Sequence, residues 1–307
     1  MHGSLEHLTV ELDLRAAGWQ EIVDEHPPVT VIAHDIIFGE GPTWDAAGEQ
    51  LYFTDIIGDT VWKWSRARGQ EVVLSPSVKG NGTCLDLQRR LLVAGWGGRT
   101  LFRIEPDGQV TTLADRWQGM KLNSPNDVVC KSDGSVWFTD PPGGLVNVGM
   151  VGHDLQRYLE TQPVFRLSPD GRTLTAVAED NIYPNGLCFS PDESILYVNC
   201  SRERVIRAYD VQGDSSLGPA RIFHRYEGPE RGVPDGIKCD VRGNVWCTAP
   251  GGIWVHDPCG TPIVRIKTPG HHPTNICFGD ADWKTLYITM IGSVVSMRVN
   301  VAGVPSR

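Results

Sequence analysis

Short runs of apolar residues recur along the chain with a regular spacing. Six runs resemble one another and read as strands: Leu51–Asp55, Leu91–Ala94, Val136–Asp140, Leu196–Asn199, Val245–Thr248 and Leu286–Thr289. Their first residues lie 40, 45, 60, 49 and 41 residues apart. A period of this length is typical of a four-stranded unit that repeats around a ring, the blade of a β-propeller.

The segments on either side of each run complete the unit. A strand and a turn rich in Asp and Gly precede each run, and a third strand follows it. A fourth strand closes five of the units, but the sixth unit reaches the chain end without one. The unmatched run Val29–Ala33 can fill that place and close the ring, which removes an open sheet edge. The pattern therefore predicts an all-β, six-bladed propeller over residues 29–307. Residues 1–28 are predicted to form an appendage that packs outside the ring.

The composition of the chain supports this fold and excludes some classes of binding partner. The chain of 307 residues contains 34 Gly and 21 Pro, which favours many tight turns. Its net charge of −9 argues against nucleic acid and anionic membranes as partners. The first residues lack the basic-then-apolar order of a secretory signal, so we expect a soluble cytoplasmic protein. Eight cysteines without a CxxC pair are predicted to be free thiols, most of them buried.

The residue just before the first strand of each unit carries a side-chain oxygen in all six units. These residues are Glu40, Asn81, Asn126, Asn185, Asp235 and Thr274. Each taken alone is an ordinary turn residue. Because first strands line the channel of a propeller, the six positions are expected to meet in a ring at one mouth. Two carboxylates there repel each other unless a cation or protons neutralise them. An all-oxygen set favours Ca²⁺, with Mg²⁺, Mn²⁺ or Zn²⁺ as alternatives.

Four phrases in this order resemble one known family. They are Gly39–Trp44, Asn123–Val128, Tyr183–Leu187 and Pro234–Gly236. The chain is similar over about residues 30–300 to the senescence-marker-protein/regucalcin/gluconolactonase family of six-bladed propellers. The resemblance implies one divalent metal held by Glu40, Asn185 and Asp235, with Asn126 contacting metal or substrate. It also implies a sugar lactone as the small-molecule substrate.

The chemistry expected of such a site is lactone hydrolysis to the aldonic acid. A divalent ion would polarise the lactone carbonyl, and Asp235 is the candidate general base, as the resemblance also implies. A carboxylate bound to a cation is a weak base, so activation of water by the metal is an equally consistent variant. Asn123 and Lys121 are candidate substrate contacts, and Ser124 stands where some animal relatives have an arginine.

Two further segments are expected at the same mouth. His272, next to His271, is a candidate substrate contact. Residues 141–162 form the longest insertion between strands and are predicted to be a lid or mouth loop.

Two other functions stay open at this point. A calcium-dependent phosphotriester or ester hydrolase would require an apolar, aromatic mouth in place of Asn and Lys. A non-enzymatic metal-binding scaffold would have no need for two carboxylates in one channel.

Overall fold

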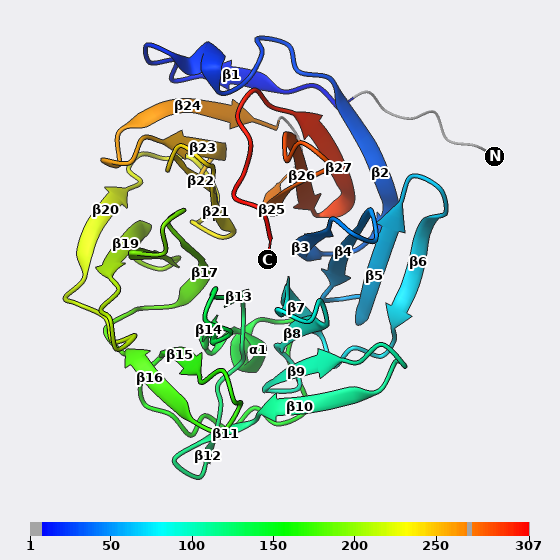
Figure 1. Cartoon of the computed structure of the whole chain (residues 1–307), viewed down its shortest axis with the longest axis vertical. Coiled ribbons are helices and arrows are strands. Elements are labelled where there is room, and N and C mark those ends of the chain that lie inside the picture. The colour runs from blue at the N-terminus through cyan, green and yellow to red at the C-terminus, as the bar shows by residue number, and fades with distance from the viewer. Residues whose placement is uncertain (1–7, 269–271, 307) are drawn as a thin grey trace.

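The computed structural model describes residues 8–268 and 272–306, and six of the sheets that they form are arranged as blades around a central axis (Figure 1). The repeating unit of each blade is an antiparallel sheet of four strands, and in blades 1 to 5 these four strands follow one another in sequence order. This confirms the predicted six-bladed propeller. Within the described residues, none of the helices has the length and apolar character needed to span a bilayer.

The blades follow one another along the chain, and in blades 1 to 5 the first strand lies at the channel. Blade 1 contains β3 (Gly39–Asp45), β4 (Gln50–Asp55), β5 (Thr60–Ser65) and β6 (Gly69–Leu74). Blade 2 contains β7 (Gly80–Leu85), β8 (Leu91–Gly95), β9 (Thr100–Ile104) and β10 (Val110–Ala114). Blade 3 contains β13 (Val128–Cys130), β14 (Val136–Thr139), β15 (Val164–Leu167) and β16 (Leu174–Ala178). Blade 4 contains β17 (Pro184–Phe189), β18 (Ile195–Cys200), β19 (Val205–Asp210) and β20 (Arg221–Arg225). Blade 5 contains β21 (Ile237–Cys239), β22 (Val245–Ala249), β23 (Gly252–His256) and β24 (Pro262–Lys267).

Blade 6 closes the ring with strands from both ends of the chain. Its inner strands are β25 (Pro273–Gly279), β26 (Thr285–Met290) and β27 (Gly292–Arg298). Its outer strand is β2 (Val29–Ile36), which pairs antiparallel with β27. The N-terminal strand predicted to complete the last blade therefore does so, and the closure leaves no blade with a missing strand.

The appendage makes a contact that the repeat pattern did not indicate. Strand β1 (Glu11–Asp13) pairs with β24 and adds a fifth, outermost strand to blade 5. A short 3-10 helix, η1 (Trp19–Glu21), follows it. Leu12, Ile22 and Val23 pack into the apolar cluster between blades 5 and 6. Burial of these apolar side chains holds the appendage against the ring.

Apolar side chains between successive blades form the core. Trp137 and Trp246 are fully buried, and each packs edge-on against a phenylalanine of the next blade. Trp64 lies in the cluster between blades 6 and 1. These tryptophans of the strands therefore serve the packing between blades.

Two additions to the blades lie between strands. A small hairpin, β11 (Arg116–Trp117) with β12 (Met120–Lys121), precedes blade 3. The insertion at residues 141–162 begins with a one-turn helix, α1 (Gly143–Val146), which Figure 1 shows near the channel. The insertion is therefore in a position to cover the channel mouth.

Candidate active site

Five of the six ring positions line one cavity. The cavity has a volume of about 290 Å³, and Glu40, Asn81, Asn126, Asn185 and Asp235 all contribute to its lining. The sixth position, Thr274, is fully buried and turns away, because its hydroxyl donates to the carbonyl of Gly39 (2.5 Å). The cavity is thus surrounded by oxygen-bearing side chains from five separate blades.

Threonines in the second strands hold this ring in place. Thr54 donates its hydroxyl hydrogen to the backbone carbonyl of Asn81 in the next blade (2.9 Å). Thr139 does the same to Asn185 (2.7 Å), and Thr248 to Thr274 (2.6 Å). Each bond is buried and joins the ring position of one blade to the second strand of the blade before it. These buried hydrogen bonds between neighbouring blades hold the backbone of the ring residues in place.

The glycine that follows several ring positions is required by close packing between blades. A Cβ on Gly186 would lie 2.2 Å from the carbonyl oxygen of Asp235. A Cβ on Gly236 would lie 2.2 Å from Oδ1 of Asn275. The N-G and D-G pairs of the sequence therefore mark places where neighbouring inner strands touch, and they are not hairpin turns.

Glu40 is buried at the bottom of the cavity. Its Oε2 accepts hydrogen bonds from the N–H of Gly41 (2.8 Å) and from Nδ2 of Asn275 (3.0 Å). Burial raises the pKa of Glu40 to about 7, although these two bonds favour the charged form, and the nearby Asp127 carboxylate adds to the rise.

Asp235 lies in the same electrostatic field. Burial raises the pKa of Asp235 well above its ordinary value, and the charges of Glu40 and Asp127 raise it further. The side chain of Asn185 hydrogen-bonds to the Asp235 carboxyl group and opposes this rise. Asn185 is itself oriented by Ser201, whose Oγ accepts from its Nδ2 (3.1 Å). The carboxyl groups of Glu40 and Asp235 therefore line the same cavity and repel each other when both are ionised.

The channel beneath the cavity holds a third carboxyl group. Asp127 is 2% exposed, and its Oδ2 is buried without a hydrogen-bond partner. Burial raises the pKa of Asp127, while the ammonium of Lys238 partly offsets this effect. The charge of Asp127 acts on both Glu40 and Asp235, and three buried carboxyl groups so close together are consistent with a divalent cation that neutralises them. Within residues 8–268 and 272–306, no three His, Cys, Asp or Glu side chains form a metal cluster by themselves, so amides would complete such a site.

Part of the cavity lining is apolar. Five apolar residues contribute to its lining: Phe38, Ile56, Trp96, Met150 and Val233. The sequence pattern alone did not assign these residues to the site. The repeat could have indicated some of the lining, because Ile56, Trp96 and Ser201 each come directly after the second strand of their blade. That strand returns the chain to the mouth where the ring begins.

The insertion after β14 covers this apolar part of the lining. The indole Nε1 of Trp96 donates to the carbonyl of Met150 (3.1 Å), and Asn147 donates to the Tyr183 hydroxyl (2.8 Å). A Cβ on Gly143 would lie 2.0 Å from the Trp96 ring. Asn147 and Met150 line the cavity, so the predicted mouth loop forms part of its wall.

Three predicted substrate contacts do not line this cavity. Asn123 is fully buried, and its Nδ2 donates to the carbonyls of Asp140 (2.9 Å) and Thr161 (3.1 Å). The ammonium of Lys121 pairs with Asp154 (2.5 Å). His272 is exposed at the start of β25, and its neighbour His271 lies outside the described residues. The structure therefore brings the four predicted metal-site residues together but leaves these three apart from them.

Ser124 and Arg202 are two further polar residues at the mouth. Ser124 anchors the insertion, because its hydroxyl donates to Pro141 (2.5 Å) and accepts from the N–H of Gly144 (2.9 Å). Arg202 lines the cavity and lies over the ring of Tyr183, 5.3 Å from its centroid. It places a positive charge at the rim of a cavity that is otherwise acidic.

Comparison with known proteins identifies relatives over nearly the whole chain. The family model described as SMP-30/Gluconolactonase/LRE-like region matches residues 38–292. A gluconolactonase of Zymomonas mobilis is 34% identical over 304 residues, which cover 92% of this chain and 84% of that protein. A pentonolactonase of Haloferax volcanii is 28% identical over 269 residues, covering 83% of this chain and 81% of that protein.

Solved structures agree with these matches. A gluconolactonase of Xanthomonas campestris, described as important in glucose secondary metabolic pathways, superimposes with a TM-score of 0.87 at 31% identity. The superposition covers 97% of this chain and 99% of the other.

Proposed function

Because this chain belongs to the SMP-30/gluconolactonase/LRE-like family, we propose that it hydrolyses a sugar lactone to the aldonic acid in the cavity that contains Glu40 and Asp235. Relatives named as gluconolactonase and pentonolactonase support this class of substrate. The observation that carries the proposal is the convergence of Glu40, Asn126, Asn185 and Asp235 on one cavity of about 290 Å³.

We further propose that the site uses a divalent metal ion, held by Glu40, Asn185 and Asp235, with Asn126 beside it. The raised pKa values of the two carboxyl groups and the orphaned oxygen of Asp127 support a cation here. When bound, such an ion would polarise the lactone carbonyl and stabilise negative charge on its oxygen. Calcium is the first candidate because every donor is an oxygen.

The residues of this chain have distinct roles in the proposed reaction. Asp235 takes a proton from the attacking water and returns it to the ring oxygen as the carbon–oxygen bond breaks. Burial raises the pKa of Asp235 and so strengthens it as a base, whereas a bound cation would lower this pKa again. Asn185 orients the Asp235 carboxyl group, and the apolar wall with Trp96 and Met150 limits access of bulk water.

A panel of five- and six-carbon aldonolactones tests the proposal, with acid release followed by a pH indicator. We expect calcium-loaded protein to exceed the spontaneous rate on at least one lactone. Asp235→Asn should lose at least a hundredfold in kcat, while the exposed Asp214→Asn serves as the matched control. Recovery of full kcat by Asp235→Asn at saturating calcium would show that Asp235 is a ligand only. No turnover of any lactone would overturn the proposal.

One observation favours a second candidate function. The apolar wall formed by Phe38, Ile56, Trp96, Met150 and Val233 is the lining expected of a calcium-dependent phosphotriester or ester hydrolase. Aryl esters and phosphotriesters therefore belong in the same panel. A preference for these over every lactone would reverse the order of the two candidates.

A further inference from the structure

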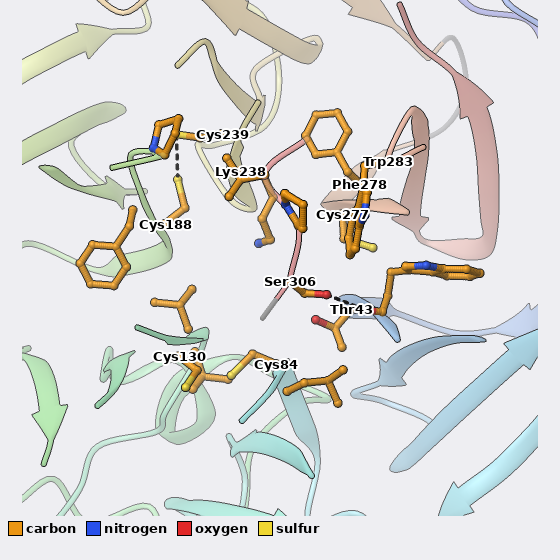
Figure 2. A pocket seen from close by; sticks show the side chains of 18 of the residues that line it. Thr43, Cys84, Cys130, Cys188, Lys238, Cys239, Cys277, Phe278, Trp283 and Ser306 are labelled. Atoms are coloured by element: carbon orange, nitrogen blue, oxygen red, sulfur yellow. Dashed lines mark hydrogen bonds between the residues drawn. The ribbon is translucent and has the colours of Figure 1, made fainter. Parts of the chain in front are cut away.

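The channel has a second cavity at its opposite mouth, separate from the candidate active site. It has a volume of about 140 Å³ and is lined by five cysteines from five different blades (Figure 2). These are Cys84, Cys130, Cys188, Cys239 and Cys277. All eight cysteines of the chain are free thiols. The lactonase proposal gives this group of thiols no role.

Two of these thiols lie in contact across neighbouring blades. The Sγ atoms of Cys188 in β17 and Cys239 in β21 are 3.7 Å apart and share a hydrogen bond (Figure 2). A disulfide requires a separation of about 2.05 Å between the two sulfurs. Rotation of the two side chains with a small approach of the two strands would supply the difference. Cys188 and Cys239 are 5% and 4% exposed, and both line the cavity, so a small reagent can approach them from there.

The surroundings of this pair keep the Cys239 thiol protonated on balance, because its pKa lies well above the ordinary value. Lys238 also lines the cavity, and its ammonium lowers the pKa of Cys239, although the shared hydrogen bond with Cys188 and burial outweigh it. The C-terminal segment lies over the same cavity, where the N–H of Val304 donates to the carbonyl of Cys239 (3.1 Å). The pair therefore lies at the edge of an accessible cavity, beneath a chain end that must move aside for larger molecules.

We propose that Cys188 and Cys239 are a modification site, an oxidisable dithiol that closes to a disulfide between blades 4 and 5. The co-reactant is a small-molecule disulfide. One protein thiolate attacks it and forms a mixed disulfide, releasing one small thiolate. The second protein sulfur displaces the other half, so two electrons pass to the reagent and the two protein protons go to the released thiols.

The link would restrain the strands that carry the candidate active site. Asn185 lies in β17, three residues before Cys188, and Asp235 precedes β21, four residues before Cys239. The two strands also touch at the active-site end, where the N–H of Gly186 donates to the carbonyl of Asp235 (3.0 Å). The disulfide would thus fix both ends of the contact between the strands that supply Asn185 and Asp235.

The test oxidises the native full-length protein with 2-hydroxyethyl disulfide, a small-molecule disulfide, and maps the products by peptide mass spectrometry. The exposed Cys259 is first replaced, as Cys259→Ser, to prevent links between molecules. We expect one cross-linked peptide pair joining Cys188 to Cys239, with a mass lower by two hydrogens, and reversal by a reducing thiol. The oxidised protein should also unfold at a higher temperature than the reduced protein.

Two single variants serve as controls in the same background, so that the test does not depend on one of them folding. Cys188→Ala and Cys239→Ala should each abolish the cross-link and the rise in unfolding temperature. Absence of the cross-link in the folded parent protein would overturn the proposal. A link between other cavity cysteines, such as Cys84 and Cys130, in place of this pair would also overturn it. Neither result depends on the lactonase activity.

Discussion

Burial of the Asp140 carboxyl group should make the protein less stable as the pH rises. Asp140 is fully buried, its Oδ2 accepts the N–H of Asn123 (2.7 Å), and its Oδ1 has no hydrogen-bond partner. Burial raises its pKa from 3.8 to about 7, although hydrogen bonds from Asn123 and Ser124 and the charge of Arg99 oppose the rise. The folded protein therefore binds more protons than the unfolded chain between these two values, and stability falls with pH in that window.

The magnitude follows from the two pKa values. The raised pKa of Asp140 lowers the free energy of unfolding by about 2 kcal/mol at pH 5 and by about 4 kcal/mol at pH 8, by proton linkage. The difference is about 2–3 kcal/mol. Asp140→Asn keeps an acceptor for the N–H of Asn123 but cannot ionise, so it removes this pH dependence.

Urea unfolding of both proteins at pH 5 and pH 8 measures the effect. The stability of Asp140→Asn relative to the parent should increase by about 2–3 kcal/mol between the two pH values. Asp133→Asn is a control that should show no pH dependence, because the hydrogen bonds of Ser135 lower the pKa of Asp133 despite its partial burial, and its carboxyl group is therefore ionised in the folded and unfolded states at both pH values. A stability difference between Asp140→Asn and the parent that does not change with pH would refute the reasoning.

Three other changes test the packing around the ring and the role of the appendage. Gly236→Ala should lower the free energy of unfolding by about 1–3 kcal/mol through overpacking against Asn275, and it should reduce kcat/KM at least tenfold. The control Gly213→Ala has open space at its Cβ and should change neither quantity. Thermal melts and lactone assays measure the two effects. Asn275→Ala removes the amide that donates to Glu40 and should cost about 1–3 kcal/mol in urea unfolding; unchanged stability would contradict that bond. Deletion of residues 1–28 should lower the melting temperature, because each buried aliphatic side chain contributes about 1.5–3 kcal/mol. It should leave turnover per folded molecule unchanged. Loss of turnover in a folded truncation would contradict our proposal that these residues are an appendage.

The repeat fixed most of the fold in advance. The sequence contains six similar strands at regular spacing, and the last unit lacks a fourth strand. The unmatched strand at Val29–Ala33 can fill that place, which closes the ring. The pairing of β1 with β24 could not be foreseen, because three residues carry no periodicity. It depends on contacts between chain segments far apart in sequence, such as Asp13 with Arg265 (2.5 Å).

The ring positions were predictable for the same reason, since equivalent positions in a propeller meet at one mouth. The roles of Asn123 and Lys121 as substrate contacts remain predictions, and the structure places both side chains outside the cavity lining. Proximity in sequence to Asn126 does not decide where a side chain points. The apolar wall went unassigned because Phe38 and Val233 read as ordinary strand-end residues until the blades are assembled.

The dependence of lactone hydrolysis on a divalent ion tests the central claim most directly. Initial rates of acid release should be measured with chelator-stripped protein before and after addition of calcium, and with Glu40→Gln in parallel. The account predicts a stripped protein no faster than the spontaneous rate, recovery with calcium, and a higher calcium requirement in Glu40→Gln. Full activity of the stripped protein, unaffected by calcium or by Glu40→Gln, would contradict it.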